Sequence, residues 1–222
     1  TTFKNVYKNK KISISKIKYI KGKQGNFFDL ENFFIKDKFK FKSIIFDNYF
    51  KILKKNFMVI HSYNLKRDKE FKKINSYFKK ERLNIAYSHG DFVHWNSIKT
   101  NNKYFLYDLE YFSKKRIFLY DIFHWLIAPI TNKLKFFKYK INYNYLLILF
   151  LKFYLNKFKF KLGNRQIIKY LLLYFLEQKY IYLLAKNINK KYNIISAKNL
   201  NNSKLLDIFY SNQIKIFLKY FK

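Results

Sequence analysis

Cysteine is absent from this chain of 222 residues. A chain without cysteine forms no disulfides and offers no thiolate for a zinc site or for nucleophilic catalysis. It also opens on Thr1 rather than Met and lacks an apolar signal segment, which we interpret as the start of a fragment or of a processed chain. Nothing here indicates secretion, and we expect a cytoplasmic protein.

Long uninterrupted hydrophobic runs are also missing, although apolar residues make up 50% of the chain and can form a packed core. The stretch 146–155 contains Lys152, and the stretch 170–184 contains Glu177 and Lys179. Neither reaches the ~18–20 uncharged residues that cross a bilayer. We therefore predict no transmembrane segment and interpret both stretches as buried bundle helices, with contact to a membrane surface as the alternative.

Acidic residues are few, 13 against 47 lysines and arginines, so the formal net charge is +34. Such a charge attracts phosphate backbones, which makes nucleic-acid binding one interpretation. However, lysine dominates the basic residues, and Lys, Asn, Ile, Phe and Tyr are together abundant and all have A/T-rich codons. We attribute the charge mainly to genome composition and do not expect nucleic acid as the principal partner. A positive surface would still attract a nucleotide.

Glycine and proline are scarce, at four residues and one. Gly22 and Gly25 do not suffice for a phosphate-cradling loop, so we predict a turn over residues 21–25. Pro129 is predicted to end a helix over residues 118–128, in which His124 and Trp125 would be core residues.

One loop concentrates the polar side chains. The mostly apolar run 83–87 predicts a strand or extended segment, and it leads into His89, Gly90 and Asp91, with Asn96 five residues after the aspartate. An isolated polar residue in a loop is usually a turn former or a cap. The joint pattern of these four residues, followed by a hairpin and two further aspartates, is much harder to obtain by chance.

Beyond Asn96, two short runs of strand-forming residues flank an Asn101-Asn102 turn, which predicts a hairpin. A hairpin returns its second strand beside its first. Asp108, at the end of the second run, should therefore lie close to Asn96.

This arrangement suits phosphoryl transfer, which needs positioning and charge neutralisation more than covalent help from the protein. Asp91 could accept or orient the proton of an attacking hydroxyl. Asn96 and Asp108 could hold magnesium against nucleotide phosphates, because magnesium takes a few hard oxygen ligands together with water. The order of these residues is that of protein kinases.

The His-Gly-Asp-x-x-x-x-Asn loop and the following Asp-x-Glu resemble the aminoglycoside phosphotransferase and choline/ethanolamine kinase family of the protein kinase-like fold. The match covers roughly residues 85–128. The resemblance implies that Asp91 is the catalytic aspartate and that Asn96 and Asp108 bind the metal and its nucleotide. It also implies that Asp121 is a buried aspartate bracing the loop.

Two features set the chain apart from protein kinases. Gly90 stands where many of them have an arginine that pairs with a phosphorylated activation loop. Only ten residues separate Glu110 from Asp121, which leaves no room for a long peptide-docking segment. We therefore expect a small hydroxyl substrate. We count His89 with Asp91 as a catalytic residue, one that would brace the loop together with Asp121. Glu110 would either bind metal or hold the strand end.

We predict an α+β fold: a predominantly helical C-terminal lobe over residues 44–222 with a small catalytic hairpin, and a remnant of the hinge over residues 1–43. Fewer than ninety residues precede His89. The N-terminal kinase lobe is therefore expected to be missing or reduced, and we nominate no nucleotide-binding lysine.

The predicted function is Mg²⁺-dependent transfer of the γ-phosphoryl group of ATP or GTP to a hydroxyl of an amino sugar, choline, ethanolamine or a saccharide precursor. A non-catalytic, kinase-derived binding protein is the first alternative. A basic protein that binds nucleic acid or a membrane surface is the second.

Apolar periodicity completes the expected elements. The predicted helices cover residues 44–57, 66–82, 143–158, 165–185 and 204–221, and a strand is predicted over residues 12–20. His61 is interpreted as a surface or packing residue. His94 is interpreted as a solvated loop histidine, with contact to a phosphate or substrate as the alternative.

Overall fold

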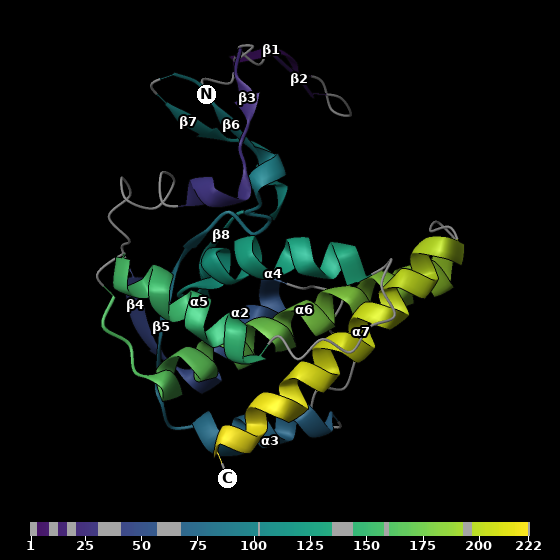
Figure 1. The fold of residues 1–222 in the computed structure, drawn as a ribbon. Helices are drawn as coiled ribbons and strands as arrows, with labels where there is room; N and C mark the ends of the chain where they lie inside the picture. The colour runs from purple at the N-terminus through teal and green to yellow at the C-terminus, as the bar shows by residue number, and fades with distance from the viewer. Residues whose placement is uncertain are drawn as a thin grey trace.

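The fold is α+β, as predicted, in a computed structural model. The residues that it describes are 4–8, 13–16, 21–30, 41–56, 68–101, 103–134, 144–157, 160–192 and 197–221. Figure 1 shows a small sheet at one end of the molecule, with the helices gathered below it and the C-terminus at the opposite end.

The predicted hairpin is present. Strands β6 (Ser97–Lys99) and β7 (Tyr104–Leu106) are antiparallel. Across the turn, the backbone N–H and the hydroxyl of Thr100 both donate to the backbone oxygen of Lys103 (2.9 and 3.0 Å). Strand β3 (Lys23–Gln24) adds to the free edge of β6, so the predicted turn over residues 21–25 contains a strand instead. Pairing with the hairpin supplies backbone partners that the local sequence does not reveal.

A second sheet carries the strand that leads to the polar loop. Strand β5 (Arg82–Ser88) lies between β4 (Phe41–Ile45) and β8 (Ser113–Ile117), with both neighbours antiparallel. Strand β4 was not predicted, and the expected boundary after residue 43 falls inside it. The helix predicted from residue 44 starts two residues later, because Ile44 and Ile45 pair with β5.

Strands β1 (Lys4–Lys8) and β2 (Ser13–Lys16) form a separate antiparallel pair. Strand β2 falls within the strand predicted over residues 12–20, and the rest of that prediction lies outside the described residues, as does His61. No observation assigns a hinge role to this segment.

Each predicted helical segment overlaps a helix, although the last two α-helices extend beyond the predicted bounds. The helices are α2 (Phe46–Asn56), α3 (Lys69–Phe78), α4 (Tyr120–Leu134), α5 (Asn144–Lys157), α6 (Asn164–Tyr192) and α7 (Ala197–Phe217), and α7 continues into the 3-10 helix η6 (Leu218–Phe221). Pro129 lies inside α4, so the prediction that it ends a helix was wrong. Proline has no backbone N–H, so α4 lacks one hydrogen bond at this position, and the packing around the helix outweighs that loss.

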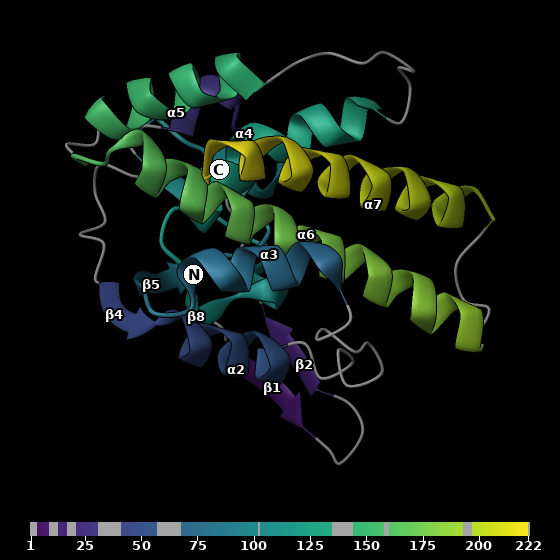
Figure 2. The ribbon, with the colours of Figure 1, turned by 90° about the horizontal axis from the view of Figure 1, so that it is seen from below.

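Helix α6 passes through the middle of the core, and α7 runs beside it (Figure 2). In α6, the side chains from residue 167 to residue 180 are all buried, and they include Glu177 and Lys179. Lys179 forms ion pairs with Asp68 (2.8 Å) and with Glu70, which explains how a lysine is accommodated there. In the part of the chain that the structure describes, no helix has the length and apolarity to span a bilayer.

Candidate active-site loop

The loop of residues 89–96 begins where β5 ends and closes with the short 3-10 helix η4 (His94–Asn96). Gly90 adopts a φ of +91°, a conformation that side-chain-bearing residues rarely adopt. A Cβ atom at this position would lie 2.2 Å from the carbonyl oxygen of Tyr111 and 2.3 Å from a guanidinium nitrogen of Arg116. Glycine is therefore required here, because Arg116 fills the space that a side chain would need.

Asp121, in the first turn of α4, holds the start of this loop. Its carboxylate accepts hydrogen bonds from the Ser88 hydroxyl (2.7 Å), the His89 backbone N–H (2.8 Å) and the Gly90 backbone N–H (3.2 Å). Three donors from consecutive residues converge on one side chain, so the loop backbone cannot shift without breaking them. The contacts are those expected of a bracing aspartate, although Asp121 is half-buried rather than buried.

His89 makes a second connection across the site. The residue is 5% exposed, and Nε2 is 2.8 Å from the backbone oxygen of Tyr107, the residue before Asp108. An N–H on Nε2 donates in this contact. The buried ring thus ties the loop to the segment after β7, which is a supporting position rather than one that reaches a substrate.

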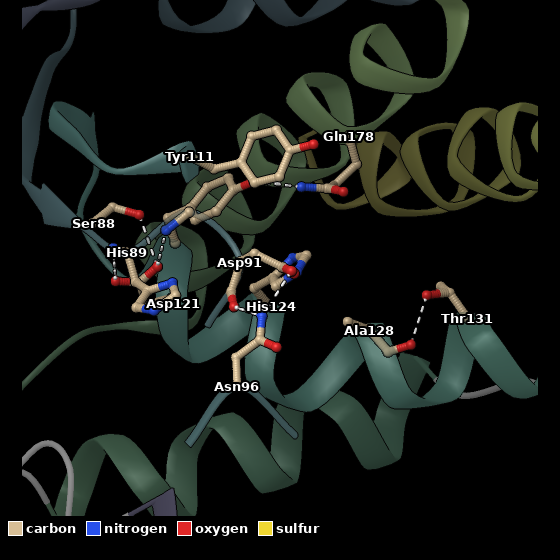
Figure 3. Close-up of polar contacts among 12 residues, drawn as sticks. Ser88, His89, Asp91, Asn96, Tyr111, Asp121, His124, Ala128, Thr131 and Gln178 are labelled. Atoms are coloured by element: carbon tan, nitrogen blue, oxygen red, sulfur yellow. Dashed lines mark hydrogen bonds and ion pairs between the residues drawn. The ribbon is translucent and has the colours of Figure 1, made fainter. Parts of the chain in front are cut away.

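Asp91 lies at the centre of the site, between Asn96 and His124 (Figure 3). The Asn96 side-chain amide donates to the Asp91 carboxylate (2.9 Å) and to its backbone oxygen (3.0 Å). His124 Nε2 is 2.9 Å from the other carboxylate oxygen. The hydrogen bond from His124 lowers the pKa of Asp91 below its ordinary value, against the opposing effect of partial burial. The Asp91 side chain remains 31% exposed, so its ionised carboxylate is accessible.

His124 is the site residue that the sequence interpretation missed. It was predicted to be a core residue, but its 12% exposed ring bridges Asp91 and the Tyr174 hydroxyl, which lies 3.0 Å from Nδ1. With the proton on Nε2, the ring donates to Asp91 and accepts from Tyr174, so both nitrogens are satisfied. The available signal was the spacing: His124 follows Asp121 by three residues, which places the two on the same helix face.

The predicted metal ligands occupy the end of the hairpin. The Tyr107 backbone N–H donates to the Asn96 backbone oxygen (3.1 Å), so the chain returns to Asn96 just before Asp108, as expected. Asp108 is exposed and has a φ of +63°. Glu110 lies in the 3-10 helix η5 (Leu109–Tyr111), but its side chain is outside the part of the chain that the structure describes.

The predicted magnesium ligands are two oxygen-bearing side chains rather than a preassembled cluster. Among the described residues, no group of three or more His, Asp or Glu side chains could hold a metal ion. The Asn96 amide oxygen and the Asp108 carboxylate make no hydrogen bond to another described residue. One neutral and one charged oxygen ligand fit a Mg²⁺ ion that keeps several waters and binds phosphates.

Two other residues of the loop have packing roles. His94 was predicted to be solvated, but its ring packs against Trp95 and Trp125, and burial lowers its pKa. The Trp95 backbone oxygen accepts from Gln24 (3.1 Å) and from the Tyr107 hydroxyl. Trp125 is fully buried, as predicted, and donates to the Phe27 backbone oxygen (2.8 Å).

Comparisons with protein-family models, with curated proteins and with solved structures found no match for this chain. The kinase-like fold and the family resemblance therefore stay predictions, supported by the order of the residues and by the contacts described above.

Proposed function

We propose that the chain is a phosphotransferase that moves the γ-phosphoryl group of a nucleotide to a hydroxyl of a small molecule. The observation that carries this proposal is Asp91: an ionised, accessible carboxylate fixed by Asn96 and His124, in a loop that Asp121 holds by three hydrogen bonds. Such pre-positioning is the main contribution that a protein makes to phosphoryl transfer.

Asp91 is suited to orienting the acceptor. Each of its carboxylate oxygens accepts one hydrogen bond from the protein and retains a lone pair for a substrate hydroxyl. Its lowered pKa makes it a weak base before the reaction. We infer that it aligns the hydroxyl first and takes the proton only as the new P–O bond forms and the bond from the γ-phosphorus to the leaving oxygen breaks.

Asn96 and Asp108 would hold the magnesium ion, which supplies charge neutralisation on the nucleotide phosphates when bound. Asn96 has two tasks in this proposal, because its amide N–H group fixes Asp91 while its amide oxygen is left for the metal. This coupling would place the acceptor and the nucleotide in a defined relation to each other.

Calorimetry of ATP and GTP binding, with and without Mg²⁺, tests the nucleotide site on the parent chain and on Asp108→Ala. Asp47→Ala is the matched control, since Asp47 is an exposed carboxylate on the distant helix α2. We expect saturable, magnesium-dependent binding that Asp108→Ala abolishes and Asp47→Ala preserves.

Equal binding by all three proteins would contradict the site and indicate that lysine charge holds the nucleotide. Absence of binding to the parent would instead favour a non-catalytic protein. If binding is found, Asp91→Asn is expected to keep it while lowering phosphoryl transfer to a screened hydroxyl acceptor by at least ~10²-fold, the order of a lost proton-handling group.

A further inference from the structure

A basic groove lies at the turn end of the hairpin, away from Asp91. It has a volume of about 1030 Å³, and four lysines line it together with Thr100 and Asn101: Lys21, Lys23, Lys99 and Lys103. This size is sufficient for a small molecule. The lysines come from two segments more than seventy residues apart in sequence, so only the pairing of β3 with β6 gathers them.

The sheet register places like charges opposite each other. Lys23 of β3 lies directly across from Lys99 of β6, and directly opposite residues of an antiparallel pair share one face of the sheet. Like charges in such a pair are destabilising. Asp29 compensates only one of them, through an ion pair with Lys99 (3.1 Å). Within the described part of the chain, Lys21, Lys23 and Lys103 form no ion pair.

The backbone around the groove is fixed. A Cβ atom on Gly22 would lie 2.5 Å from the Ile98 side chain and 2.7 Å from the Lys99 backbone oxygen, so β3 is held against β6 as closely as glycine permits. On the other side, three hydrogen bonds join Thr100 and Lys103 across the turn. The backbone that carries the lysines is thus held in place, and the lysine side chains line one groove.

We propose that this groove is a binding site for a small, multiply charged phosphate compound, such as a di- or triphosphate group. An anion beside Lys23 would supply the counter-charge that Asp29 supplies to Lys99, and Lys21 and Lys103 can contact further phosphate oxygens. The site is distinct from the proposed site of phosphoryl transfer, because the three residues of β6 separate Lys99 from Asn96 by about 10 Å.

A nucleic-acid backbone has the same phosphate chemistry, but the groove favours a compact anion. Its charges surround one hollow at the end of a short sheet, whereas tracking a strand requires an extended positive path. The two ligands differ in their response to salt, since the affinity for a long polyanion falls steeply as counterions are released.

Calorimetry with inorganic pyrophosphate in EDTA tests the groove without magnesium and therefore without the proposed nucleotide site. The test variant is Lys23→Gln/Lys103→Gln. The control is Lys72→Gln/Lys73→Gln, which removes the same charge from exposed positions of α3. We expect saturable binding to the parent and to the control, and an affinity at least about tenfold lower for the test variant, the effect of losing a charge-assisted contact.

Equal losses in the two variants would overturn the proposal, because they would show that net charge alone attracts the anion. Tighter binding of a single-stranded oligonucleotide than of pyrophosphate, lost steeply with salt, would assign the groove to nucleic acid and overturn it too. Circular dichroism verifies that the variants are folded. Pyrophosphate binding that persists in Asp108→Ala would support the groove even if the proposed phosphotransferase activity failed.

Discussion

Two carboxylates of this protein have similar partners and opposite accessibility. Glu177 is fully buried, where it pairs with Arg116 (2.8 Å) and accepts from the Tyr49 hydroxyl (2.9 Å). Asp91 also has a nitrogen-bearing partner and a second donor, but its side chain is 31% exposed. Burial raises the pKa of Glu177, with Arg116 opposing it, whereas the His124 contact lowers the pKa of Asp91.

The two carboxylates differ in whether a substrate can reach them. The Glu177 carboxylate is enclosed by Arg116, Tyr49 and the core, so no substrate can reach it. Asp91 has equally directed contacts but keeps a solvent-facing side. A fixed carboxylate becomes a candidate for chemistry only when part of it stays open, and that criterion selects Asp91 over Glu177.

The largest effect is expected from Glu177→Gln. The substitution leaves the Arg116 guanidinium, only 5% exposed, without its counter-charge. Breaking a buried ion pair on one side costs about 3–5 kcal/mol of unfolding free energy. Chemical denaturation measures the loss. The double variant Arg116→Met/Glu177→Leu should be less destabilised than the single one, because it removes both buried charges, and a single variant of parental stability would refute the structural role.

A smaller loss is expected from Asp121→Asn. An amide offers one acceptor oxygen in place of two, so the new NH₂ group would face either the His89 N–H or the pair of donors from Ser88 and Gly90. Leaving such a donor unsatisfied costs about 1–3 kcal/mol. Denaturation should show this loss, and hydrogen exchange should be faster at the His89 and Gly90 amides.

The control for that comparison is Asp47→Asn, a change of the same kind at an exposed position in the first turn of α2. It should alter stability by less than about 0.5 kcal/mol. Similar losses in Asp121→Asn and Asp47→Asn would show that the bracing contacts contribute nothing specific.

The smallest change concerns Asp91 itself. Replacing His124 with Phe keeps a ring but removes the donor that lowers the Asp91 pKa, so that pKa should rise toward its ordinary value. Carboxyl ¹³C NMR, with the signal assigned from Asp91→Asn, measures the shift. His94→Phe is the matched control, because His94 packs on Trp95 and Trp125 instead. An unchanged Asp91 titration in His124→Phe would exclude the proposed positioning role.

The same shift fixes the sign of a pH effect. Because the native pKa of Asp91 is lowered, its contribution to stability is present above the unfolded value of about 3.9 and is lost as the pH falls through the native pKa. His124→Phe should therefore lose its deficit relative to the parent chain as the pH falls below about 4. His94→Phe should instead change relative to the parent as the pH falls through about 6.5, because the lowered pKa of His94 destabilises the parent there.

Sequence reasoning succeeded where a pattern is local. The hairpin after Asn96 follows from two strand-forming runs around a polar turn, and the helices follow from apolar periodicity. The same reasoning misplaced Ile44 and Ile45, because strand pairing with β5 overrode their helical pattern. It also ended a helix at Pro129, where the packing of α4 tolerates the missing donor.

The sequence by itself determined the spacing of Asp91, Asn96 and Asp108. The contacts of this loop with itself and with the hairpin span few residues, so spacing constrains them. Only the tertiary structure decided that His124 contacts Asp91, that Glu177 meets Arg116, and that Lys23 faces Lys99. These partners lie 33, 61 and 76 residues apart, and which distant side chains meet depends on how helices and strands pack, since no local pattern encodes it.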